Sequence, residues 1–303
     1  MAEQTGRRGG RRSAPATLGA LLVLMIAAGI AGVVVGLIVW PVSSSRAPAA
    51  QAREARALPA LQGWRASTQP CETLLPAAQR PLLLLAMGQS NAGNHAASGE
   101  AGDMPLPLLQ GGRCGLTDDP LPGASGAGAS LWSAVHTRLQ GQLAGRPLVW
   151  AVIAVDGSPL SQWLGPGPLR HHWERELASL LAQARQQGWP VAAVLWQQGE
   201  ADARAGRAAQ AYADDLRRLQ QAMAEHGLDA PWWLAQSGRC PPADGQALRP
   251  ARERLWREAP QQFKPGPDTD VLGPELRQGC HFNAAGRQAA AALWAQRLQA
   301  ATW

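Results

Sequence analysis

From about position 81 onward, short continuous apolar runs alternate with longer stretches in which apolar residues recur at helical spacing. The runs do not alternate strictly between apolar and polar residues, which is typical of strands buried on both faces, as in parallel sheets. They predict strands at Leu82–Ala86, Leu148–Val155, Val191–Trp196 and Trp232–Ala235, with a weaker fifth at Thr269–Leu272.

The stretches between the runs are long enough to be crossover helices. Helical spacing predicts them at Leu131–Leu143, His172–Gln187, Ala205–His226, Ala247–Gln261 and Ala284–Ala300. Strands that alternate with helices in this way predict an α/β fold, a three-layer α/β/α sandwich with a mainly parallel sheet, of flavodoxin-like type. The segment Ala96–Ala129, rich in Gly and Pro, is predicted to be a long loop at the rim of a substrate site.

The N-terminal part differs in composition from the rest. Residues 1–17 hold an arginine cluster, and the uncharged stretch 18–40 is long enough, at about 35 Å of helix, to cross a bilayer core of roughly 30 Å. It is predicted to be an uncleaved signal anchor; the alternative is cleavage at "AAQA", Ala49–Ala52. Residues 41–70 are interpreted as a linker and residues 71–303 as the domain. By the positive-inside rule, we expect a single-pass protein of the cytoplasmic membrane with its domain in the periplasm or outside the cell.

The net charge is +6 and the pI is near 10. Basic residues are nearly all Arg, four of them lie in the N-terminal tail, and the others form no basic helix face. We therefore do not expect a nucleic-acid partner.

Four cysteines follow the membrane segment, and none has the C-x-x-C spacing of a zinc or redox site. In an oxidising compartment, four cysteines allow three pairings. We predict Cys71–Cys114 and Cys240–Cys280, because the second pair ties the end of a strand region to the loop before His281.

A polar cluster follows each of several predicted strands, and a further one precedes the last predicted helix. The clusters are "GQSN" at Gly88–Asn91, "VDGSPLSQW" at Val155–Trp163, "WQQGEAD" at Trp196–Asp202 and "GCHFNAAG" at Gly279–Gly286. In a parallel sheet these loops open on the same side. Ser90, Gly157, Gln198, Glu200 and His281 are therefore predicted to converge.

These four segments resemble the sequence blocks of the SGNH hydrolase superfamily, in particular its sialate O-acetylesterases and the acetylxylan esterases of carbohydrate esterase family six. The resemblance extends over about Pro81–Trp303. It implies a serine nucleophile at Ser90 and a general base at His281. It also implies an oxyanion hole formed by the backbone N–H groups of Ser90 and Gly157 and by the side-chain amide of Gln198. Gln89 and Asn91, on either side of the serine, are candidate substrate-binding residues.

Physical chemistry supports these roles independently. A serine hydroxyl needs a base to accept its proton near neutral pH, and a tetrahedral oxyanion needs fixed hydrogen-bond donors. Glycine at position 157 allows the backbone to approach the oxyanion closely.

One position departs from the family pattern. Many SGNH enzymes have an aspartate three residues before the histidine, whereas this chain has Gln278, which carries no charge. Glu200 is the first candidate for the missing acid, with Glu275, Asp270 or a Ser–His dyad as alternatives.

The sequence thus predicts a membrane-anchored serine esterase that removes O-acetyl groups from a carbohydrate through an acyl-enzyme intermediate. The alternative is a catalytically impaired protein of the same fold that binds glycans or assists envelope polysaccharide assembly. A lipase or thioesterase fits the branch less well, because no long apolar lid segment is present. The expected partners are an acetylated glycan and the membrane, and neither a metal nor an organic cofactor is implied.

Overall fold

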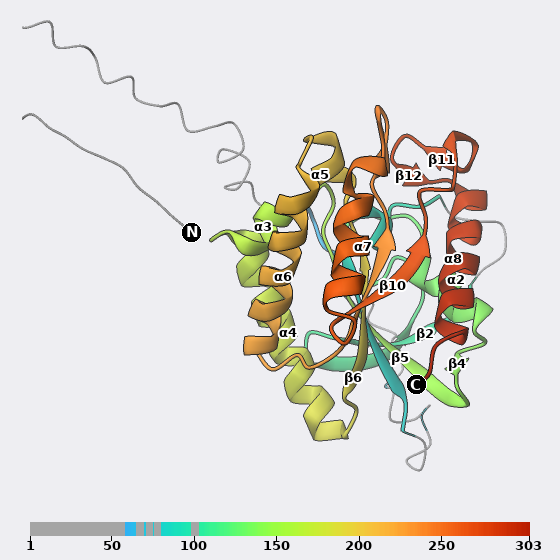
Figure 1. The fold of residues 1–303 in the computed structure, drawn as a ribbon. Coiled ribbons are helices and arrows are strands. Elements are labelled where there is room, and N and C mark those ends of the chain that lie inside the picture. The colour runs from blue at the N-terminus through green and yellow to red at the C-terminus, as the bar shows by residue number, and fades with distance from the viewer. Residues whose placement is uncertain (1–57, 65–69, 71–74, 76–79, 98–102) are drawn as a thin grey trace, which may run out of the picture. The chain divides into compact units, whose positions relative to one another are not determined.

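The computed structural model describes residues 58–64, 70, 75, 80–97 and 103–303 (Figure 1). The predicted tail at 1–17 and membrane segment at 18–40 lie outside these residues. Within the part that is described, no helix is both long enough and apolar enough to cross a membrane.

The described residues form an eight-stranded, mainly parallel sheet, as the sequence predicts. Seven of its strands follow the order β10-β7-β6-β1-β5-β2-β3, and β4 pairs with β5. Only β3 and β4 run antiparallel to their neighbours. The strands are β1 (Leu82–Gly88), β2 (Leu106–Gln110), β3 (Arg113–Thr117), β4 (Gln142–Leu143), β5 (Arg146–Ala154), β6 (Val191–Gln197), β7 (Trp232–Gln236) and β10 (Phe263–Asp268).

Helices cover both faces of the sheet, which gives the expected three layers (Figure 1). On one side lie α2 (Leu131–Arg138) and α8 (Ala284–Gln299); on the other lie α3 (Leu160–Leu164), α4 (Pro168–Gln187), α6 (Ala209–Glu225) and α7 (Arg249–Glu258). Successive residues of β1 belong alternately to the two apolar cores, so the central strand is buried on both faces.

Short elements at the carboxyl edge of the sheet complete the domain. They are η2 (Ser90–Ala92), α5 (Glu200–Arg204), β8 (Arg239–Cys240), β9 (Ala243–Asp244), η3 (Gln246–Leu248), η4 (Pro274–Leu276), β11 (Arg277–Gln278) and β12 (His281–Phe282).

Three predicted elements are wrong in position or extent. The strand predicted at Thr269–Leu272 lies instead at Phe263–Asp268, where Phe263 pairs with Trp232 of β7. Asp270 lies in a turn, and its carboxylate accepts hydrogen bonds from the backbone N–H groups of Gly238 and Arg239. The helix predicted at 131–143 ends at Arg138, and the residues after it enter β4. The helix predicted at 205–226 begins only at residue 209.

The segment predicted as a rim loop, 96–129, contains two strands. β2 and β3 form an antiparallel hairpin at the edge of the sheet. Leu108 and Leu109 of β2 are buried on opposite faces of the sheet, so the hairpin extends both apolar cores.

The predicted linker at 41–70 includes residues that belong to the folded domain. The backbone N–H of Gln62 donates to the carbonyl of Ala124, and Leu61 forms a β-bridge with Ser125. The domain therefore starts before Cys71, at least as early as Leu58, which packs against the core.

Candidate active site

The candidate site lies at the carboxyl edge of the sheet, where the ends of β1, β5 and β6 meet. Ser90 begins η2 after the end of β1, Gly157 follows the end of β5, and His281 begins β12. A glycine is required at position 88, which has φ of +145°, because a Cβ there would collide with the backbone of Gln197. The close approach of β1 and β6 thus places Ser90 at the sheet edge.

Ser90 and His281 share a carboxylate neighbour, Asp156. The Oδ1 atom of Asp156 lies 3.9 Å from Nε2 of His281. The nearby His281 imidazole, with smaller contributions from His95 and Ser90, lowers the pKa of Asp156 against the opposing effect of partial burial. The arrangement holds an anion beside the serine and the histidine at neutral pH.

Sequence reasoning did not select Asp156 as a site residue, although it lies within the second polar cluster, immediately before Gly157. Gln278, at the position of the family's aspartate, pairs with His281 in the β11–β12 ladder. Its amide supplies no charge, and Asp156 approaches the histidine from a different loop. A carboxylate at a predicted strand end was the signal available in the sequence.

Asn91 connects the serine turn to the histidine loop. Its Nδ2 donates to the carbonyl of Cys280 at 3.0 Å, and its Oδ1 accepts from the backbone N–H of Phe282 at 3.3 Å. These two residues flank His281, so Asn91 fixes the histidine backbone next to Ser90.

Glu200 does not hydrogen-bond with His281, contrary to the sequence-based expectation. Its Oε1 accepts from Asn91 Nδ2 at 2.7 Å and from the Ser237 hydroxyl at 2.8 Å, while its Oε2 has no hydrogen-bond partner. Glu200 is 1% exposed. In this structure its hydrogen bonds reach the histidine loop through Asn91.

Among the described residues, neither alternative acid forms a hydrogen bond or an ion pair with His281. Asp270 accepts from the backbone N–H groups of Gly238 and Arg239, and it thereby fixes the turn before β8. Glu275 is exposed in η4, and its backbone carbonyl accepts from the Asn283 side chain.

Gln198 has both amide hydrogens committed within the protein. Its Nε2 donates to the carbonyl of Ser158 at 3.1 Å and to Oδ2 of Asp202 at 2.6 Å, while its Oε1 accepts from the Tyr212 hydroxyl at 2.8 Å. The side chain is fully buried. The predicted oxyanion contact would therefore require Gln198 to give up one of these bonds.

Gln89 is also buried, with 3% exposure, and its Oε1 accepts from the backbone N–H of Ala201. Gln89 thus links the serine turn to α5, while Asn91 links it to the histidine loop. The observed contacts make both predicted substrate-binding residues part of the support beneath the site.

Two backbone donors remain for an oxyanion. Among the backbone hydrogen bonds of the described residues, none uses the N–H of Ser90 or of Gly157. Gly157 is exposed, has φ of +63°, and has open space where a Cβ would project. A substrate oxygen can therefore approach its backbone.

The histidine loop is held by a disulfide and by a buried arginine. Cys240 and Cys280 are bonded, with Cα atoms 4.4 Å apart, which confirms the predicted pairing. Arg277 donates to the carbonyls of Cys280 and Thr269, at 2.9 and 2.8 Å. The other predicted pairing cannot be described, because Cys71 lies outside the described residues.

Among the described residues, His95, Asp156 and His281 form a group that could provide metal ligands, with their ligand atoms within 4.8 Å of one another. The rings of His95 and His281 are 5.0 Å apart, and Nε2 of His95 contacts the Ser125 hydroxyl at 3.1 Å. Burial lowers the pKa of His95, which keeps that ring neutral at physiological pH.

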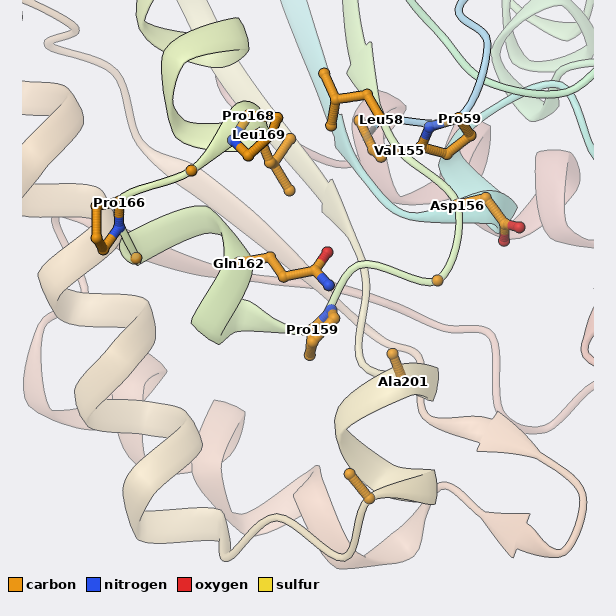
Figure 2. Close-up of a pocket in the computed structure, with 14 residues that line it drawn as sticks. Leu58, Pro59, Val155, Asp156, Pro159, Gln162, Pro166, Pro168, Leu169 and Ala201 are labelled. Atoms are coloured by element: carbon orange, nitrogen blue, oxygen red, sulfur yellow. The ribbon is translucent and has the colours of Figure 1, made fainter. Parts of the chain in front are cut away.

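A pocket of about 430 Å³ opens on the Gly157 side of the site (Figure 2). Asp156 and Gly157 form part of one wall, and α3 and the start of α4 form another. Gln162 projects from α3 into this space, and Ala201 of α5 closes its lower side in the view. Leu58 and Pro59, from the segment predicted as a linker, complete the lining.

The family comparison identifies this protein as a carboxylic ester hydrolase. The family described as "carbohydrate esterase, sialic acid-specific acetylesterase" matches residues 119–232, so the resemblance predicted from the motifs is confirmed. The matched span includes Asp156, Gly157, Gln198 and Glu200; Ser90 and His281 lie outside it.

Solved structures show the same fold. A protein from Arabidopsis thaliana is 18% identical, with a TM-score of 0.56 and coverage of 71% of this chain and 97% of its own. The structure of NanS is 14% identical, with a TM-score of 0.50 and coverage of 73% and 97%. No curated protein matches the chain.

Proposed function

We propose that this protein is a serine O-acetylesterase that acts on an acetylated carbohydrate through an acyl-enzyme intermediate. The observation that carries the proposal is the convergence of Ser90 and His281 on Asp156, with Asn91 connecting the two loops. The carbohydrate esterase family match supports acetyl ester hydrolysis.

In the proposed mechanism, His281 accepts the Ser90 proton while the serine oxygen attacks the acetyl carbonyl. The backbone N–H groups of Ser90 and Gly157 donate to the oxyanion. Asp156 stabilises the imidazolium that forms, because its carboxylate lies 3.9 Å from the ring nitrogen. The protonated histidine then donates its proton to the departing sugar oxygen, which leaves as a hydroxyl group. Water next attacks the acetyl-serine, His281 accepts the proton of the water and returns it to Ser90, and acetate is released.

The decisive experiment is hydrolysis of p-nitrophenyl acetate by the purified full-length protein. Ser90→Ala and His281→Ala are each expected to reduce turnover by about a thousandfold or more. Ser179→Ala and His171→Ala on α4 remove the same chemical groups away from the site and should retain wild-type turnover. An organophosphate that labels Ser90, located by peptide mass spectrometry, would report the nucleophile directly.

The competing function is glycan binding without turnover, and the commitment of both Gln198 amide hydrogens is the observation in its favour. If the wild-type protein binds an acetylated glycan but its turnover equals that of Ser90→Ala, this alternative replaces the esterase.

We also propose that residues 18–40 anchor the chain in the cytoplasmic membrane with the esterase domain outside the cytoplasm. The support is the arginine cluster before an uncharged stretch of membrane-spanning length. Alkaline phosphatase fused after Trp303 should be active in intact cells. An intact but inactive fusion would contradict the proposed orientation.

A further inference from the structure

The pocket beside Gly157 has the size of a small-molecule binding site. Its volume of about 430 Å³ lies within the usual range of roughly 300–1,000 Å³ for ligand pockets. It adjoins the backbone donor of Gly157, so a sugar held here could present its acetyl group to Ser90.

Most of the lining residues have apolar side chains, and none carries a positive charge. It includes four prolines, whose rings offer flat apolar surfaces to the C–H faces of a sugar; these are Pro59, Pro159, Pro166 and Pro168. The polar side chains of the lining are the amide of Gln162 and the carboxylate of Asp156. Among the described lining residues there is no Lys, Arg or His.

We propose that this pocket binds the acetylated sugar ring and selects sugars without a carboxylate, although the matching family is described as specific for sialic acid. A sugar carboxylate in the pocket would lose water without gaining a cationic partner. It would also lie on the same wall as the Asp156 anion, where like charges repel. An uncharged sugar incurs neither cost. The inference rests on the esterase function proposed above.

A charge-matched substrate pair tests this selectivity. The full-length protein is given 9-O-acetyl sialic acid methyl glycoside or the same compound with its C1 carboxylate converted to a carboxamide, and acetate release is measured. We expect kcat/KM for the carboxamide to exceed that for the carboxylate by about tenfold or more. Equal values, or a preference for the carboxylate, would overturn the inference.

Gln162→Arg tests whether this pocket is where the carboxylate and the carboxamide are distinguished, because it introduces a cation into the pocket. It should raise the carboxylate-to-carboxamide ratio of kcat/KM by about tenfold. The matched control is Gln221→Arg on α6, which makes the same charge change outside the pocket lining and should leave the ratio at its wild-type value.

Asp156→Asn is the second test and covers the case in which Gln162→Arg does not fold. Whatever its overall rate, it should raise the same ratio, because the repelling anion is removed. If neither folded variant changes the ratio, the pocket does not bind the sugar. If the wild-type protein does not hydrolyse p-nitrophenyl acetate, the esterase function itself is contradicted. Failure of the selectivity inference and failure of the esterase proposal can therefore be distinguished.

Discussion

Asp156 and Glu200 both lie at the carboxyl edge of the sheet, close to the loop that carries His281, yet their environments are opposite. Asp156 borders the pocket, has a side chain that is 43% exposed and lies 3.9 Å from the histidine ring. Glu200 is 1% exposed and contacts only Asn91 and Ser237 through its hydrogen bonds.

The comparison separates two ways in which a carboxylate can serve one histidine. An exposed anion beside the ring can stabilise a charge that appears during the reaction. A buried carboxylate that contacts the histidine loop through another side chain can hold the backbone that carries the ring. The two environments therefore predict different consequences when Asp156 or Glu200 is replaced.

The largest effect is expected from Asp156→Asn. It should reduce turnover of p-nitrophenyl acetate by about tenfold to a hundredfold, because the imidazolium loses its neighbouring anion. The thermal midpoint should change little, since the side chain is partly solvent-exposed. Turnover within about twofold of wild type would remove Asp156 from the mechanism.

Glu200→Ala should act first on stability. It leaves the Asn91 amide and the Ser237 hydroxyl without their shared acceptor in a buried site, at a cost of about 2–3 kcal/mol in the free energy of unfolding. Urea denaturation provides the measurement. A fully stable variant with strongly reduced turnover would indicate that Glu200 acts directly on His281 after all.

A third expectation concerns acid conditions, where loss of folding must be distinguished from loss of catalysis. Burial lowers the pKa of His136 to about 4, and its Nδ1 accepts from the Trp150 indole N–H. In the unfolded chain His136 binds a proton near pH 6.5, whereas in the folded chain it does so only near pH 4. The free energy of unfolding therefore falls as the pH drops below about 6.5.

Between pH 7 and pH 5, this histidine should lower the unfolding free energy by about 2 kcal/mol. Denaturation curves at the two pH values measure the change, and His136→Gln should flatten the dependence. An equally steep dependence in that variant would assign the effect to other groups. Kinetic data on Asp156→Asn are best collected where folding is complete.

The smallest effect is expected from Glu200→Gln. Oε1 accepts both hydrogen bonds and Oε2 accepts none, so an amide oxygen can replace Oε1. Turnover should stay within about threefold of wild type and stability within about 1 kcal/mol. A fall of several orders of magnitude would restore Glu200 as the charged partner of His281 and reverse the comparison.

The sequence alone determined the layered α/β fold and the meeting of polar clusters at one sheet edge. These features follow from local information: continuous apolar runs indicate buried parallel strands, and parallel strands end at a common edge. The Cys240–Cys280 bond was one of three pairings that the sequence allowed, and the structure selected it. Ser90 and His281 were selected from short motifs and from the resemblance of those motifs to an esterase family.

Only the tertiary structure decided which side chains meet within that edge. The direction of a side chain in a turn depends on how neighbouring loops pack, and periodicity carries no information about it. Asp156 therefore faces His281 while Glu200 points beneath Asn91, although both follow parallel strands. The amide of Gln198 is likewise committed by Tyr212 and Asp202, which approach it from helices whose packing no local pattern specifies.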